Sequence, residues 1–182
     1  MVYLMYRKVG EVMYIDTIIK ENNFGTKEDV LKLFTQLKED YYEIFRDVNL
    51  NLNEYWWTHI GFNYANEKAT ISIIIDKYLD MSLDMYKKEN TSFIEIFKNT
   101  NLKVTEMSLL HELGHYLDFL DNPELFAINA ELDDLNYSTY CQKYPLLKHD
   151  TYFSSKIYRK QLTEQRADRY ALQMAKALGR MK

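Results

Sequence analysis

Cysteine, proline and glycine are all scarce in this sequence, which contains one, two and five of them in 182 residues. The single cysteine, Cys141, excludes an internal disulfide and favours a reducing compartment. Because few glycines and prolines are available for flexible linkers, we expect one domain over residues 1–182. The sequence also lacks a run of roughly 20 apolar residues and a signal-peptide pattern. These absences predict a cytoplasmic protein that does not associate with a membrane.

Positive charge is not in excess either, since the net charge is −4. A global basic surface for nucleic acid is therefore not expected. The stretch from Lys156 onward is locally basic, and we interpret it as a solvated helix face, with nucleic-acid binding as a weaker alternative. The basic residues concerned are Lys156, Arg159, Lys160, Arg166, Arg169, Lys176, Arg180 and Lys182.

Hydrophobic periodicity predicts a mostly helical α+β fold with one small sheet. Thr26 is a predicted N-cap for a helix that continues to about Val48, within an N-terminal helical part of about residues 1–50. The segments Tyr55–Asn63, which is aromatic, and Ala69–Ile75 are both predicted to be strands, and together they are expected to form a β-hairpin. Further helices are predicted at Glu11–Glu21, Asp76–Lys88, Thr91–Lys98, from Asn101 or Thr105 to Pro123, at Leu125–Tyr137 and at Leu162–Leu178.

The predicted helix before Pro123 contains His111-Glu112-Leu113-Gly114-His115. Residues four apart share one face of a helix, so His111 and His115 can both reach one metal ion. Glu112 lies about 100° around the helix and is placed to accept a proton from a metal-bound water. Two imidazoles, a water and a carboxylate are what a zinc hydrolase needs, and we expect one Zn²⁺ per chain.

The leucines of the same helix predict which side is buried. On a helical wheel they lie away from the two histidines, so they supply the contact with the core. The histidines are therefore not needed as core residues. The leucines are Leu109, Leu110, Leu113, Leu117 and Leu120.

A third protein ligand is required, and Glu164 is the best candidate. It shares a helix face with Asp168, and Ala167, Ala171 and Ala175 follow the same stripe. Small side chains allow a second helix to approach the first closely. Asp121 and His149 remain alternatives.

Two further carboxylates are candidates for outer contacts of the metal site. Metal-bound histidines usually donate their other N–H to a carboxylate or a carbonyl group. Asp168 could orient His111 in this way. Asp118, one turn after His115, could do the same or could be an acid of the last helical turn.

The two motifs, HELGH and Glu164-Gln-Arg-Ala-Asp168-Arg-Tyr-Ala171, resemble those of gluzincin-type zinc metallopeptidases. Similar motifs occur in the ImmA/IrrE-type branch and in the anthrax lethal factor-like and Pro-Pro endopeptidase branch. The resemblance implies a zincin-like domain in which His111, His115 and Glu164 bind zinc and residues 51–182 carry the sheet and the site. It also implies a protein or peptide substrate.

The resemblance implies two more features of the site. An edge strand commonly aligns the peptide in such enzymes, and Thr70–Ile75 could serve, although an internal strand is equally compatible with its isoleucines. The lethal factor-like branch has a tyrosine seven residues before the glutamate as oxyanion donor, where this chain has Ile157. Tyr158, Tyr152 or His149 could replace it, and Tyr158 is adjacent to that position.

The sequence therefore predicts a zinc-dependent endopeptidase with Glu112 as general base. The alternative is a catalytically silent regulator or interaction module built on the same scaffold. An intact Glu112 favours the enzyme, because a silent scaffold has no use for that base.

Overall fold

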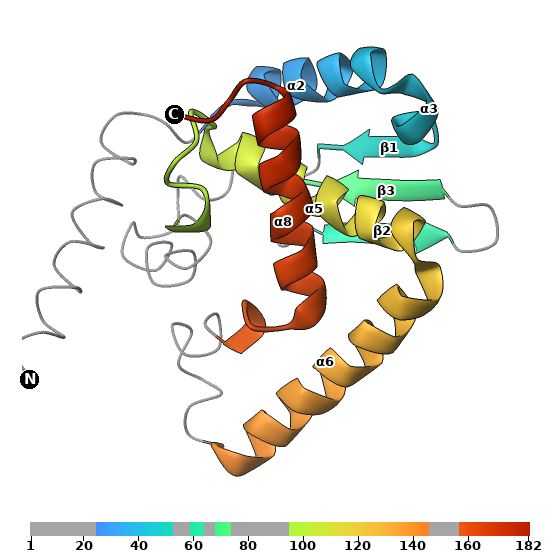
Figure 1. Cartoon of the computed structure of the whole chain (residues 1–182), viewed down its shortest axis with the longest axis vertical. Helices are drawn as coiled ribbons and strands as arrows, with labels where there is room; N and C mark the ends of the chain where they lie inside the picture. The colour runs from blue at the N-terminus through green and yellow to red at the C-terminus, as the bar shows by residue number, and fades with distance from the viewer. Residues whose placement is uncertain (1–24, 53–58, 64–67, 74–94, 146–156) are drawn as a thin grey trace, which may run out of the picture.

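The computed structural model describes residues 25–52, 59–63, 68–73, 95–145 and 157–182 (Figure 1). In these ranges the chain is mostly helical with one small sheet, which confirms the predicted α+β class. The helices predicted at Glu11–Glu21 and Asp76–Lys88 lie outside the described residues. The elements are α2 (Lys27–Asp40), α3 (Tyr42–Phe45), β1 (Val48–Asn51), β2 (His59–Asn63), β3 (Lys68–Ser72), α5 (Val104–Asp121), α6 (Pro123–Lys143) and α8 (Leu162–Ala177).

Helix α2 begins at the predicted cap. The side chain of Thr26 accepts a hydrogen bond from the backbone N–H of Asp29, whose carboxylate accepts one from the backbone of Thr26. The prediction of one helix to Val48 is wrong, because the helix ends at Tyr41, where φ is −133°. The short helix α3 follows, and Val48 then opens strand β1.

The sheet has three strands in the order β1-β3-β2. β2 and β3 pair in antiparallel orientation, which confirms the predicted hairpin pairing. β1 pairs with the other edge of β3, in parallel orientation. β3 is therefore the central strand, so of the two alternatives for Thr70–Ile75 the internal strand is correct for the described part and the edge strand is not. Its residues alternate in burial over positions 68–71, with Ala69 and Ile71 buried and Lys68 and Thr70 exposed, so one face of β3 packs against the core.

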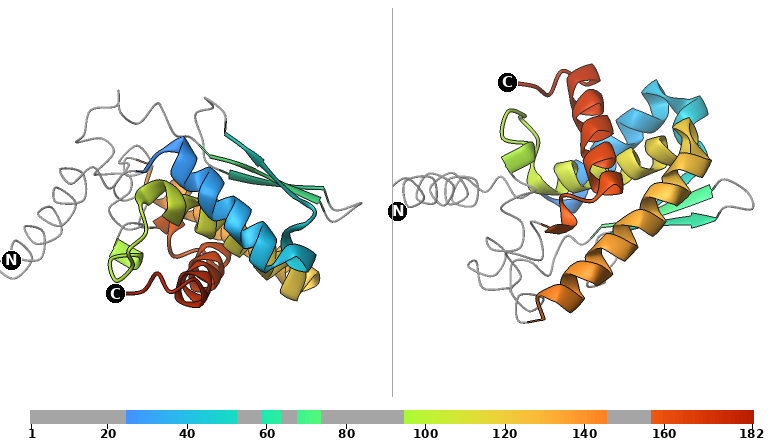
Figure 2. Two further views of the ribbon diagram at one scale, coloured as in Figure 1. Left: turned by 90° about the horizontal axis from the view of Figure 1, so that it is seen from above. Right: turned by 60° about the horizontal axis from the view of Figure 1, so that its bottom comes forward.

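Helix α5 is the centre of the fold, between the sheet and α8 (Figure 2). It contacts α2 and α6 as well, so it is buried around most of its circumference. Leu109, Leu110 and Leu113 are fully buried, as predicted, whereas Leu120 is 39% exposed and does not belong to the core. Leu117 is partly buried against the same core.

Helix α6 begins at Pro123, two residues before the predicted start at Leu125, with Asn122 as its N-cap and proline in the first turn. It continues to Lys143, beyond the expected end near Tyr137, and runs away from the sheet (Figure 1). Helix α8 ends at Ala177, close to the predicted end at Leu178, and it is followed by Gly179, whose φ of 66° suits glycine. None of the helices in the described ranges is long and apolar enough to cross a membrane.

Candidate metal centre

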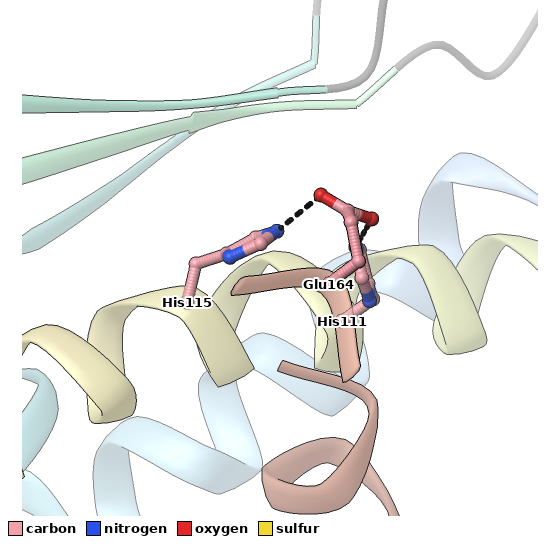
Figure 3. A group of neighbouring side chains, drawn as sticks. All are labelled: His111, His115 and Glu164. Carbon is pink, nitrogen blue, oxygen red and sulfur yellow. Dashed lines mark ion pairs between the residues drawn. The ribbon is translucent and has the colours of Figure 1, made fainter. Parts of the chain in front are cut away.

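Two histidines of α5 form one wall of the site. His111 and His115 lie one turn apart, and their ring centroids are 4.8 Å from each other. They are 4% and 9% exposed, so their imidazoles face the interior. The predicted common direction of the two rings is confirmed (Figure 3).

Glu164 of α8 reaches both histidines (Figure 3). Its Oε2 lies 3.2 Å from Nε2 of His111, and its Oε1 lies 3.3 Å from Nε2 of His115. One ligand atom from each of the three residues falls within 4.8 Å of the other two. These three buried side chains could therefore hold a metal ion, whereas Asp121, the alternative on α5, has a side chain 61% exposed. His149 lies outside the described residues.

Small residues allow α8 to come this close to α5. Ala167, Ala171 and Ala175 are all fully buried, which confirms the predicted stripe. Opposite them is Gly114, where an added Cβ would lie only 2.2 Å from the carbonyl oxygen of Ala167. A glycine inside a helix costs about 1 kcal/mol relative to alanine, so its presence in the motif was a signal of close packing.

Asp168 holds the far side of His111, as predicted. Its Oδ1 lies 2.8 Å from Nδ1 of His111, so Nε2 remains directed at Glu164. Burial lowers the pKa of His111, but the hydrogen bonds to Asp168 and Glu164 outweigh it and raise the pKa to about 9. The imidazole is therefore positively charged at neutral pH, with a proton on both ring nitrogens. A metal cation that binds at Nε2 would displace the proton of that nitrogen.

The carboxylate of Glu164 is kept ionised by the same contacts. Burial by itself raises the pKa of Glu164, yet hydrogen bonds from His111 and His115 hold it well below its usual value. A buried anion between two imidazoles is a favourable setting for a divalent cation.

Glu112 and Tyr158 lie beside the three ligand side chains. Glu112 is 7% exposed and follows His111 directly, on the next face of α5. Burial raises the pKa of Tyr158 above its usual value, and the carboxylates of Glu164 and Glu112 add to the rise. Although 45% of the whole residue is exposed, its phenol interacts with the site and stays protonated at neutral pH. Tyr152 and His149 lie outside the described residues.

Arg159 also belongs to the site, although no motif in the sequence indicated it. Its Nη1 lies 3.0 Å from Oε2 of Glu164 and 3.2 Å from Oδ1 of Asp168, and its side chain is only 16% exposed. The interpretation as part of a solvated basic face is therefore wrong for Arg159. The sequence did contain a signal for this contact, because Arg159 lies only five residues before Glu164, which shares a helix face with Asp168.

Asp118 interacts with α8. It is fully buried, and its Oδ1 accepts a hydrogen bond from Nε of Arg166, which also pairs with Asp121 at 3.6 Å. Burial raises the pKa of Asp118, against the lowering effect of Arg166 and of His115 nearby. Asp118 thus joins the two helices beside His115, and Arg166 is a second residue wrongly placed on the solvated face.

Comparisons with known proteins give no match to a family model, to a curated protein or to a solved structure. The resemblance to gluzincin peptidases therefore stays a prediction, based on the two motifs.

Proposed function

We propose that this protein is a zinc-dependent endopeptidase whose metal ligands are His111, His115 and Glu164. The observation that carries the proposal is the meeting of these three buried side chains from two helices. Tetrahedral zinc with bonds of about 2.0–2.2 Å has neighbouring ligand atoms about 3.3–3.5 Å apart. The 3.2 and 3.3 Å separations between Glu164 and the two histidines suit such a site.

The outer contacts support zinc as well. Asp168 accepts from Nδ1 of His111, which fixes the ring and raises the basicity of Nε2. Such a carboxylate–histidine pair is a regular feature of zinc sites. The group consists of nitrogen and carboxylate donors, which zinc accepts readily.

A zinc ion held by His111, His115 and Glu164 would lower the pKa of a water to about 7 and would supply a Lewis acid for the substrate carbonyl. In this mechanism Glu112 takes the proton of the attacking water and passes it to the leaving amine nitrogen of the peptide. The Tyr158 hydroxyl, which stays protonated, donates a hydrogen bond to the carbonyl oxygen as negative charge develops there. Asp168 and Arg159 hold His111 and Glu164 in place during these steps.

The proposal is tested by the metal content and by cleavage of a peptide library. We expect close to one zinc per chain, and we expect Glu112→Gln to keep its zinc while hydrolysis is lost. A purified chain that holds no zinc and is unaffected by His111→Ala would contradict the proposal. Zinc bound without cleavage of any peptide or protein would instead favour the catalytically silent scaffold.

A further inference from the structure

The first turn of α8 is capped by a residue of another helix. Gln161 occupies the N-cap position, but its side chain makes no capping hydrogen bond. In its place, the carboxylate of Asp133 on α6 accepts from the backbone N–H of Leu162 at 2.8 Å and of Thr163 at 2.9 Å. It also accepts from the Thr163 hydroxyl at 2.9 Å.

This carboxylate is buried, with Asp133 only 4% exposed. Burying a charged group is costly unless it is well hydrogen-bonded, and here the three bonds from α8 supply that compensation. The first N–H groups of a helix lack partners inside it, and its N-terminus favours a negative charge. Asp133 therefore meets both requirements of α8 at once.

The residue that follows these capped positions is Glu164, the third residue of the helix. A helix frays first at its ends, where backbone hydrogen bonds are missing. If the first turn of α8 opened, the Glu164 carboxylate would lose its fixed distance to His111 and His115. The ligand that completes the metal group is thus placed where it depends most on a cap.

We propose that Asp133 is a positioning residue of the metal centre, which holds the first turn of α8 so that Glu164 is presented to His111 and His115. This inference rests on the proposed zinc site. It assigns to α6 a part in metal binding, although α6 contributes none of the three ligand side chains.

The test compares zinc affinity across variants by competition with a chromophoric chelator. Asp133→Ala should weaken zinc binding by at least about tenfold, the lower end of the loss usual for outer contacts of a metal site. Asp134→Ala is the matched control, because Asp134 is the next residue of α6 and is exposed. Its affinity should stay within about twofold of the original chain.

A second variant tells whether Asp133 acts on zinc binding through the first turn of α8 or only through general stability. In it, the cap of α8 is supplied by the N-cap residue itself in place of Asp133. In the double variant Asp133→Ala/Gln161→Asp, an aspartate at the N-cap can accept from the N–H groups of Thr163 and Glu164. If Asp133 acts through α8, this variant should recover most of the lost affinity. A folded Asp133→Ala chain with the original zinc affinity, or a loss that Gln161→Asp does not restore, would overturn the inference.

If Asp133→Ala does not fold, Asp133→Asn takes its place, since its amide oxygen keeps one acceptor. A folded Asp133→Asn chain should bind zinc more weakly, and unchanged affinity would again overturn the inference. An original chain that binds no zinc would contradict the proposed function itself. An original chain that binds zinc, alongside variants that bind it equally well, contradicts the role of Asp133 alone.

Discussion

Nδ1 of His111 and Oδ1 of Asp168 lie 2.8 Å apart across the interface of α5 and α8. The contact links the two motifs through residues that are 57 positions apart in the chain. It leaves Nε2 of the same ring directed at Glu164, so one histidine receives its orientation from one carboxylate of α8 and faces the other. The helix pair therefore orients the His111 ring through contacts within the protein.

Removing this contact should weaken metal binding. We expect Asp168→Ala to lower zinc affinity by about 10–100-fold, because the ring loses the acceptor that fixes it. Competition with a chromophoric chelator measures the change. Gln173→Ala, an exposed position of the same helix, is the control and should be close to neutral. Equal affinities in the two variants would contradict the role given to Asp168.

A methyl group at position 114 should destabilise the protein. Alanine is favoured over glycine in a helix by about 1 kcal/mol, so propensity alone predicts that Gly114→Ala stabilises. The new Cβ, however, would lie 2.2 Å from a backbone oxygen of α8, which cannot move aside cheaply. We expect a net loss of about 1–3 kcal/mol in the free energy of unfolding, measured with urea. A rise in stability would show that the two helices separate freely.

The buried ion pair between the helices should be sensitive to loss of one partner. Arg166→Gln leaves the fully buried carboxylate of Asp118 without its counter-charge. We expect a loss of about 3 kcal/mol in the free energy of unfolding, compared with less than about 0.5 kcal/mol for the exposed Arg169→Gln. The double variant Asp118→Asn/Arg166→Gln should be more stable than the sum of the single losses implies. Additive losses would show that the two residues act independently.

Asp29 should make the free energy of unfolding depend on pH in the acidic range. Its carboxylate accepts from the backbone N–H of Thr26 and from Nζ of Lys103, each at 2.7 Å. Burial raises the pKa of Asp29, but these hydrogen bonds outweigh it and lower the pKa below its usual value. A lowered pKa in the folded state contributes stability that is complete above the unfolded value of about 3.9 and is lost as the pH falls through the folded value.

The variant Asp29→Asn tests this dependence in metal-free protein. It should be about 1 kcal/mol less stable than the original chain at pH 7, because its neutral amide makes weaker hydrogen bonds with Thr26 and loses the charge that attracts Lys103. The difference should shrink as the pH falls below 4, whereas Glu28→Gln, at an exposed neighbouring position, should show little difference at either pH. A difference that is the same at pH 7 and pH 3 would mean that the charge of Asp29 is not involved.

The helices and the metal group were predictable because their signals are local. Helical spacing placed His111 and His115 on one face, and the alanine stripe indicated that Glu164 could approach them. The cap of α2 and the start of α6 follow from side chains within a few residues of each helix end. Such features need little knowledge of the rest of the chain.

The missed features depend on tertiary contacts. Strand β1 follows α3 directly, and it is the pairing with β3, more than its own sequence, that makes it a strand. That pairing also makes β3 a central strand, a choice that the isoleucines of Thr70–Ile75 left open. Arg159 lies near Glu164 only because the chain turns just before α8, and Asp133 caps that helix from another element. Neither contact leaves a periodic pattern in the sequence.

Gly114 lies so close to α8 that the HELGH motif has a packing requirement in addition to its chemical one. Within the HELGH motif, metal binding and proton transfer use the two histidines and Glu112, and they place no demand on the position before the second histidine. In this fold that position faces a backbone oxygen, which no exchange of side chains on α8 could make smaller. In this fold the motif therefore has four constrained residues, His111, Glu112, Gly114 and His115, and Gly114 is constrained by the packing of two helices and not by the chemistry of the site.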